Sequence, residues 1–118
     1  MDIKKVVVIG SGTMGSGIAA QVANAGIPVY LLDISTEIAT NALERIKKSR
    51  PSLLMNENNS TLIHAGNIED DMDHINDADW IVEAVVERIN IKKSIYAKID
   101  SRRKSGAVVS SNTSSIPL

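Results

Sequence analysis

The chain has 118 residues, enough for one domain with its own hydrophobic core. Its formal net charge is −1 and it has no cysteine, which argues against nucleic-acid or lipid partners and excludes disulfides, thiolate zinc sites and cysteine nucleophiles. Aromatic residues make up only 3%, so the core must be aliphatic. No run approaches the roughly 20 apolar residues that span a bilayer. With no signal-peptide core at the N-terminus, we expect a cytoplasmic protein.

The first part of the chain alternates apolar runs with helical patterns. Residues 5–9 form a β-branched run typical of a strand buried on both faces, and residues 13–25 carry apolar side chains at helical spacing. Residues 29–33 predict a second buried strand. Ser35 is a candidate cap for the following helix, which Pro51 ends.

The same alternation continues to the end of the sequence, although less regularly. Residues 62–65 predict a brief third strand after a polar loop, and residues 80–85 a fourth strand after an acidic connector. Residues 89–106 show the spacing of a helix, and residues 107–110 predict a fifth strand.

Alternating strands and helices favour right-handed βαβ crossovers, so the predicted fold is an α/β, Rossmann-type, doubly wound parallel sheet of about five strands with flanking helices. We interpret residues 1–118 as one domain. A complete dinucleotide fold has two halves of three strands each, and this sequence supplies about two strands of the second half. We therefore expect a domain that is incomplete at its C-terminus.

The glycines of "GSGTMG" follow the first strand and open the first helix. Gly10, Gly12 and Gly15 form the G-x-G-x-x-G fingerprint, in which the first glycine permits a tight turn, the second lets a diphosphate approach and the third lets helix and strand pack closely. Asp33 ends the second strand, where a carboxylate accepts hydrogen bonds from ribose hydroxyls and repels a 2′-phosphate. The pattern favours NAD over NADP. FAD, or glycines that serve packing alone, remain alternatives.

Other polar residues suggest no second site. His64 and His74 are the only histidines, and we expect structural or solvent roles for both. The acidic segment 69–73 lacks the glycine and spacing of a calcium loop, so we predict a solvated surface with caps for short helices and no metal. Asp79 is expected to turn the chain into the fourth strand. The serines of residues 110–115 lack a nucleophile elbow, which favours binding over nucleophilic catalysis.

Two segments, "VEAVVE" at residues 82–87 and "SNTSS" at residues 111–115, make the chain resemble the L-3-hydroxyacyl-CoA dehydrogenase family. The resemblance covers almost the whole chain. It implies NAD as cofactor and oxidation of the 3-hydroxyl of an acyl-CoA in fatty acid metabolism. It also implies a C-terminal helical domain, absent from these residues, which completes the acyl pocket and forms a homodimer interface.

The resemblance also implies roles for individual residues. Ser114 would lie beside the nicotinamide and the substrate hydroxyl, and Ser49 matches a position that contacts CoA, although the basic residue expected after it is not evident. The residues expected to contact the cofactor are Gly10, Gly12, Thr13, Met14, Gly15, Asp33, Val85, Glu87, Lys92 and Ser114.

The family's general base is a histidine in an H-F-F-N-P segment, which is not among these residues. Alcohol oxidation needs a base within hydrogen-bond reach, and Ser114 cannot accept the proton alone. We therefore expect the isolated chain to bind NAD without turnover. Two alternatives stay open: a stand-alone, non-enzymatic NAD-binding module, and an NAD-dependent enzyme of a neighbouring family.

Overall fold

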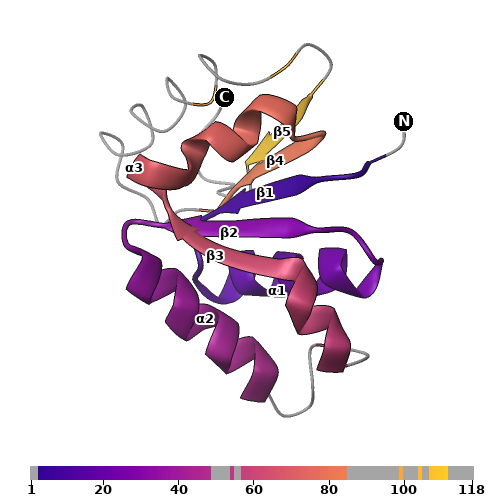
Figure 1. Cartoon of the computed structure of the whole chain (residues 1–118), viewed down its shortest axis with the longest axis vertical. Coiled ribbons are helices and arrows are strands. Elements are labelled where there is room, and N and C mark those ends of the chain that lie inside the picture. Colours follow the sequence, from indigo (N-terminus) through magenta and orange to yellow (C-terminus); the bar gives the residue numbers. More distant parts are fainter. Residues whose placement is uncertain are drawn as a thin grey trace.

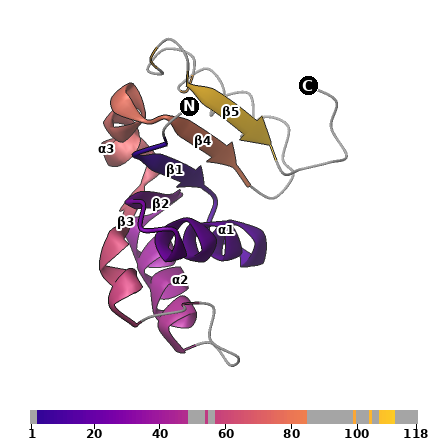
Figure 2. The ribbon, with the colours of Figure 1, turned by 90° about the vertical axis from the view of Figure 1, so that its right-hand side faces the viewer.

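A five-stranded parallel sheet is the centre of the fold, with strand order β3-β2-β1-β4-β5 (Figure 1). The computed structural model describes residues 3–48, 54, 57–84, 99, 104 and 107–111. The strands are β1 Val6–Ile9, β2 Val29–Asp33, β3 Ile63–Asn67, β4 Trp80–Glu83 and β5 Val108–Ser111. The strand order reverses beside β1, and the carboxyl ends of the strands face the same way (Figure 2). The predicted doubly wound α/β fold is confirmed.

Helices cover both faces of this sheet. The two longer helices, α1 (Thr13–Asn24) and α2 (Thr36–Lys48), lie on one face, and α3 (Ile68–Asp71) lies on the other (Figure 1). Two 3-10 helices, η1 (Glu57–Leu62) and η2 (Met72–Asp77), flank β3 and α3 in sequence. No helix of the described residues is both long enough and apolar enough to cross a membrane.

The alternating side chains of β1 are buried on both faces of the sheet, as predicted. Val8 packs with Ala19 and Ala23 of α1 on one face, whereas Ile9 packs with Ile75 and Ile81 on the other. The small alanines of α1 let the helix approach the sheet closely, and all six side chains are fully buried. Burying β1 on both faces fixes it as the centre of the domain.

Most predicted boundaries lie within a few residues of the observed ones. The third strand is longer than predicted and runs to Asn67, and the acidic connector that follows it is folded into α3 and η2 because Ile68 and Ile75 are buried there. The fourth strand is described to Glu83, and the helix predicted over residues 89–106 lies outside the described residues except at positions 99 and 104.

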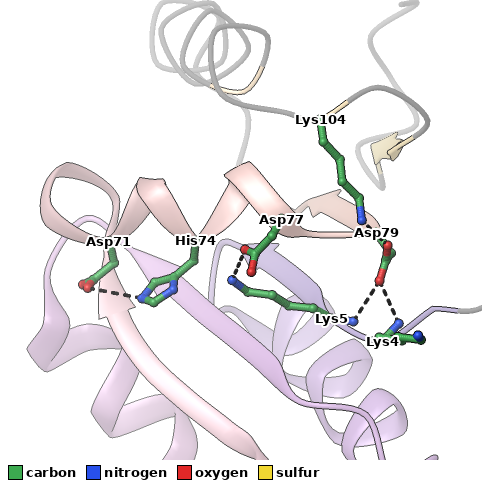
Figure 3. Close-up of polar contacts among 7 residues, drawn as sticks. All are labelled: Lys4, Lys5, Asp71, His74, Asp77, Asp79 and Lys104. Atoms are coloured by element: carbon green, nitrogen blue, oxygen red, sulfur yellow. Dashed lines mark hydrogen bonds and ion pairs between the residues drawn. The ribbon is translucent and has the colours of Figure 1, made fainter.

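Asp79 ties three segments together at the amino-terminal edge of the sheet (Figure 3). Its Oδ2 accepts hydrogen bonds from the backbone N–H groups of Lys4 and Lys5 at 2.8 and 3.2 Å, and its Oδ1 accepts one from Lys104 Nζ at 2.5 Å. Beside it, Lys5 Nζ pairs with Asp77. The predicted role of Asp79 at the start of the fourth strand is confirmed.

These contacts make the domain's stability sensitive to acid. The hydrogen bond from Lys104, followed by the backbone N–H of Lys4, holds the pKa of Asp79 below its ordinary value, and the hydrogen bond from Lys5 does the same for the pKa of Asp77. Since a lowered folded-state pKa favours the ionised form, this stabilisation is complete above the unfolded-state pKa of about 3.9 and is lost as pH falls through the folded-state pKa.

We therefore predict that Asp79→Asn lowers the free energy of unfolding at pH 7 and flattens its decline below about pH 4. Urea denaturation at a series of pH values measures both effects. Glu37→Gln makes the same change in net charge on an exposed side chain of α2 and serves as the control. Parallel acid profiles for Asp79→Asn and the wild type would contradict the assignment.

Candidate functional site

The turn between β1 and α1 brings backbone atoms unusually close together. Gly10 has φ 105°, a conformation that L side chains rarely adopt, and its N–H donates to the carbonyl of Leu32 at 2.7 Å. A Cβ at Gly15 would lie 1.8 Å from the carbonyl oxygen of Gly10. Both glycines are therefore required by the geometry of the turn, as the fingerprint predicted.

Gly12 begins the helix and leaves its amino end open. It is the N-cap of α1, no side chain caps the helix, and a Cβ placed on Gly12 would meet no atom within 4 Å. The first intrahelical bond runs from Ser16 N–H to the Gly12 carbonyl at 2.8 Å. The backbone N–H groups before Ser16 point along the helix axis, where an anion can accept their hydrogen bonds. This end of α1 fits a diphosphate.

Asp33 is held against this turn by three hydrogen bonds. Its Oδ2 accepts from the backbone N–H of Ser11 at 2.7 Å and from Ser11 Oγ at 2.5 Å, and its Oδ1 accepts from the N–H of Ile34 at 2.7 Å. The residue is half-buried at the carboxyl end of β2. The acid predicted to bind a ribose thus lies beside the turn predicted to bind the diphosphate.

Ser11 is the functional residue that the sequence analysis missed. It is only 1% exposed, and its carbonyl accepts from Ser16 Oγ at 2.9 Å and from the Arg45 guanidinium at 3.2 Å. Every hydrogen-bonding group of Ser11 is therefore engaged. The available signal was a hydroxyl residue between the first two glycines of the fingerprint. It lies two residues beyond β1, the strand that pairs with the strand ending in Asp33.

Apolar side chains are exposed around the same edge of the sheet. Met14, in the first turn of α1, is 57% exposed; Ile34, directly after Asp33, is 65% exposed; and Ile38, in the first turn of α2, is 44% exposed. Ser35 Oγ accepts from Ile38 N–H at 3.2 Å, which confirms Ser35 as a cap of α2. Exposed apolar surface beside a carboxylate suits a ligand that combines a flat ring with hydroxyl groups.

The structure brings together only part of the predicted site. Gly10, Gly12, Met14, Gly15 and Asp33 lie around one edge, together with the backbone of Thr13. The remaining predicted residues, Val85, Glu87, Lys92, Ser114 and Ser49, lie outside the described residues. In the sheet, Glu83 pairs with Ser111, so the segments that follow β4 and β5 both leave from the carboxyl edge. Glu83 itself is fully buried.

Both histidines lie beside Tyr30, away from Asp33. The ring of Tyr30 stacks on His64 and His74 at centroid distances of 4.8 and 3.9 Å, and Lys5 Nζ lies 4.8 Å from the Tyr30 centroid. His74 also approaches Asp71 at 4.0 Å (Figure 3). These contacts support the structural roles predicted for the histidines. Within the described ranges, no three metal-ligating side chains gather.

Two hollows lie elsewhere on the surface. One of about 580 Å³ at the amino edge is lined by Lys5, Asp77, Asp79 and Lys104 among others, whose charges already pair with one another. A second, apolar hollow of about 590 Å³ lies along the side of α1, and Met14 and Trp80 are among the residues that line it. Neither hollow includes Asp33, so the candidate site rests on the contacts at the turn.

Comparison with known proteins agrees with this geometry. Residues 5–118 match the family described as 3-hydroxyacyl-CoA dehydrogenase, NAD binding domain. A probable 3-hydroxyacyl-CoA dehydrogenase of Deinococcus radiodurans is 44% identical to the chain over 125 residues, with 100% of this chain and 36% of that protein covered. A putative fatty acid oxidation complex trifunctional enzyme of Rickettsia felis is 43% identical, with 99% of this chain and 17% of that protein covered.

Among solved structures, FadB2 of M. tuberculosis superposes with a TM-score of 0.84 at 33% identity, covering 100% of this chain and 44% of that one. The chain thus spans less than half the length of each of these proteins.

The turn geometry predicts opposite effects for two glycines of α1. Gly15→Ala should lower the free energy of unfolding by about 3 kcal/mol, because the new Cβ would overlap the Gly10 carbonyl. Gly17→Ala is the matched control, since a Cβ there meets nothing within 4 Å; it should stabilise the helix by about 0.5–1 kcal/mol. Urea denaturation measures both, and equal effects would contradict the close approach.

Gly12→Ala separates binding from folding. The new Cβ has open space, so the free energy of unfolding should fall by no more than about 1 kcal/mol, the usual cost of a poorer N-cap. NAD affinity should fall about tenfold or more, because the methyl group occupies the space through which a diphosphate reaches the helix amides. Calorimetric titration with NAD measures this, and unaltered affinity would exclude the anion site at Gly12.

Proposed function

This chain belongs to the family of NAD-binding domains of 3-hydroxyacyl-CoA dehydrogenases, and from that premise we propose that it provides the cofactor site of an enzyme that oxidises (S)-3-hydroxyacyl-CoA to 3-oxoacyl-CoA. One observation carries the proposal. The Asp33 carboxylate is hydrogen-bonded to the turn between β1 and α1, so it lies beside the uncapped amino end of α1. The role in fatty acid oxidation is supported by relatives such as the trifunctional enzyme of Rickettsia felis.

The described residues fit NAD, the cofactor of this family. The first-turn amides of α1 would hold the diphosphate at Gly12, and Asp33 Oδ1 would accept a hydrogen bond from the adenosine ribose. The exposed side chains of Met14 and Ile34 would cover the adenine. When bound, NAD accepts the hydride that leaves the substrate carbon.

The same residues favour NAD over NADP. The negative charge of Asp33 would repel a 2′-phosphate, and the residues that follow it, Ile34 and Ser35, supply no positive charge to bind one. Arg45 reaches the turn, but its guanidinium donates to the Ser11 carbonyl. A 2′-phosphate would therefore meet the Asp33 carboxylate, and neither of the two residues directly after it offers a cation.

The proton acceptor for alcohol oxidation would come from outside this chain. His64 and His74 stack on Tyr30, in the part of the sheet near Lys5, so neither is placed to act as the base. Ser114 would orient the substrate hydroxyl. In this proposal the complete enzyme is cytoplasmic, binds acyl-CoA and forms a homodimer, with Ser49, Val85, Glu87 and Lys92 contributing further contacts to CoA or cofactor.

The test is a calorimetric titration of the chain with NAD and NADP, each with and without acetoacetyl-CoA. We expect saturable binding of NAD and weaker binding of NADP. In a separate assay with NADH in place of NAD, we expect no oxidation of NADH by acetoacetyl-CoA. Asp33→Arg should reverse the preference, because the guanidinium replaces repulsion of the 2′-phosphate by attraction. Asp73→Arg makes the same change in charge on η2 and should leave the preference unchanged.

Two results would contradict the proposal. Absence of saturable NAD binding in the wild-type chain would remove the cofactor site. An Asp33→Arg variant that retains the wild-type preference for NAD would remove the ribose assignment while leaving the diphosphate site intact.

A further inference from the structure

The Asp33 carboxylate is almost fully occupied before any ligand arrives. An ionised carboxylate offers about four acceptor positions, two on each oxygen. Ser11 fills both positions of Oδ2 with its N–H and its hydroxyl, and the N–H of Ile34 fills one position of Oδ1. The remaining acceptor position belongs to Oδ1. A ribose would therefore meet one oxygen of Asp33 in a single fixed orientation, and not a freely turning carboxylate.

We propose that Ser11 is a specificity-determining residue, whose hydroxyl fixes Asp33 in the orientation that distinguishes NAD from NADP. This inference rests on the proposed function of the site. Any non-proline residue at position 11 would supply the backbone N–H that donates to Asp33. Only the second hydrogen bond, from the hydroxyl, requires the serine side chain. Ser11 acts through Asp33 and is therefore a positioning residue.

The hydroxyl is suited to hold the acid because Ser11 cannot itself move. Its side chain is 1% exposed, and its carbonyl is held by Ser16 Oγ and by Arg45 from two different helices. The O–H···O⁻ distance of 2.5 Å is that of a charge-assisted hydrogen bond, which is roughly twice as strong as a neutral one. Asp33 is thereby attached to the turn between β1 and α1, and the proposed ribose and diphosphate positions are held as one unit.

A fixed carboxylate affects the two dinucleotides in opposite directions. For NAD it presents a preorganised acceptor to the ribose hydroxyl, so no side-chain freedom has to be lost on binding. For NADP it prevents the negative charge from turning away from the 2′-phosphate. Loss of the Ser11 hydroxyl should therefore weaken NAD binding and, at the same time, reduce the discrimination against NADP.

The competing explanation is that Ser11 only fills space in a tight turn. Truncation would then weaken NAD and NADP binding by the same factor, through loss of stability alone. A second possibility is that the hydroxyl competes with the ribose for Oδ2, in which case its removal would raise NAD affinity. The ratio of the two affinities distinguishes these explanations from the proposal.

The experiment compares Ser11→Ala with Ser35→Ala in the 118-residue chain, by calorimetric titration with NAD and NADP. Ser35→Ala is the matched control, because it also removes one hydroxyl that makes a hydrogen bond at the same edge of the sheet, to Ile38 N–H. We expect Ser11→Ala to reduce the NAD-to-NADP affinity ratio about tenfold, and Ser35→Ala to leave it at the wild-type value. ADP-ribose and its 2′-phosphate should show the same reduction, which locates the effect in the adenosine half.

A double-mutant cycle tests the route through Asp33. In an Asp33→Asn background, where the charge is already absent, Ser11→Ala should leave the ratio unchanged. Should Ser11→Ala fail to fold, Ser11→Cys keeps a side chain in the buried position with a weaker donor, and the same reduction is expected.

The outcomes separate this inference from the proposed function. Wild-type binding of NAD with an unchanged or increased ratio in Ser11→Ala overturns the role of Ser11 and leaves the NAD site in place. A reduction that persists in the Asp33→Asn background also overturns it. If the wild-type chain binds neither dinucleotide, the proposed function and this inference are both wrong.

Discussion

The domain depends on the direct contact between the backbone of α1 and the end of β1. The Cβ position of Gly15 is filled by the carbonyl oxygen of Gly10, so the helix can begin only because no side chain is there. The parallel register of β1 and β2 then pairs Ile9 with Leu32 and leaves Asp33 beside the turn that follows β1. A ligand site at this edge is thus a consequence of how closely the first helix packs on the sheet.

The two edges of the sheet use charge in different ways. At the amino edge, Asp77 and Asp79 form ion pairs with Lys5 and Lys104, so the charges of the acids and of the lysines balance. These ion pairs also connect the ends of strands. At the carboxyl edge, Asp33 accepts only from backbone N–H groups and a hydroxyl, and it forms no ion pair with a described side chain. The Asp33 carboxylate therefore keeps a negative charge that can attract or repel a ligand, whereas the charges of Asp77 and Asp79 are paired with those of lysines. This difference explains why one acidic edge is structural and the other is a candidate binding site.

Sequence reasoning found those features that depend on local pattern. The apolar run of β1, the glycine spacing and the position of Asp33 all follow from periodicity and turn chemistry, and each was placed correctly. Ser11 was missed because its importance comes from a partner on another strand, which no local pattern records. The acidic connector was predicted as a solvated surface with caps for short helices, and the short helices α3 and η2 lie there. The burial of Ile68 and Ile75 beneath it was not predicted, because polar residues outnumber them in this segment. The residues assigned by resemblance near the nicotinamide, such as Ser114, remain predictions.

The geometry also explains why the same fingerprint serves many reactions. In the proposed site, the helix amides, the acid and the open surface at Gly12 would contact the part of a dinucleotide that does not react. Asp33, the acid proposed to discriminate against a 2′-phosphate, is held by hydrogen bonds from Ser11 and Ile34. The paired ends of β4 and β5, at Glu83 and Ser111, lie at the same edge of the sheet. In the proposed enzyme, the residues that choose the cofactor lie at the ends of β1 and β2, and the ends of β4 and β5 lie further along the same edge.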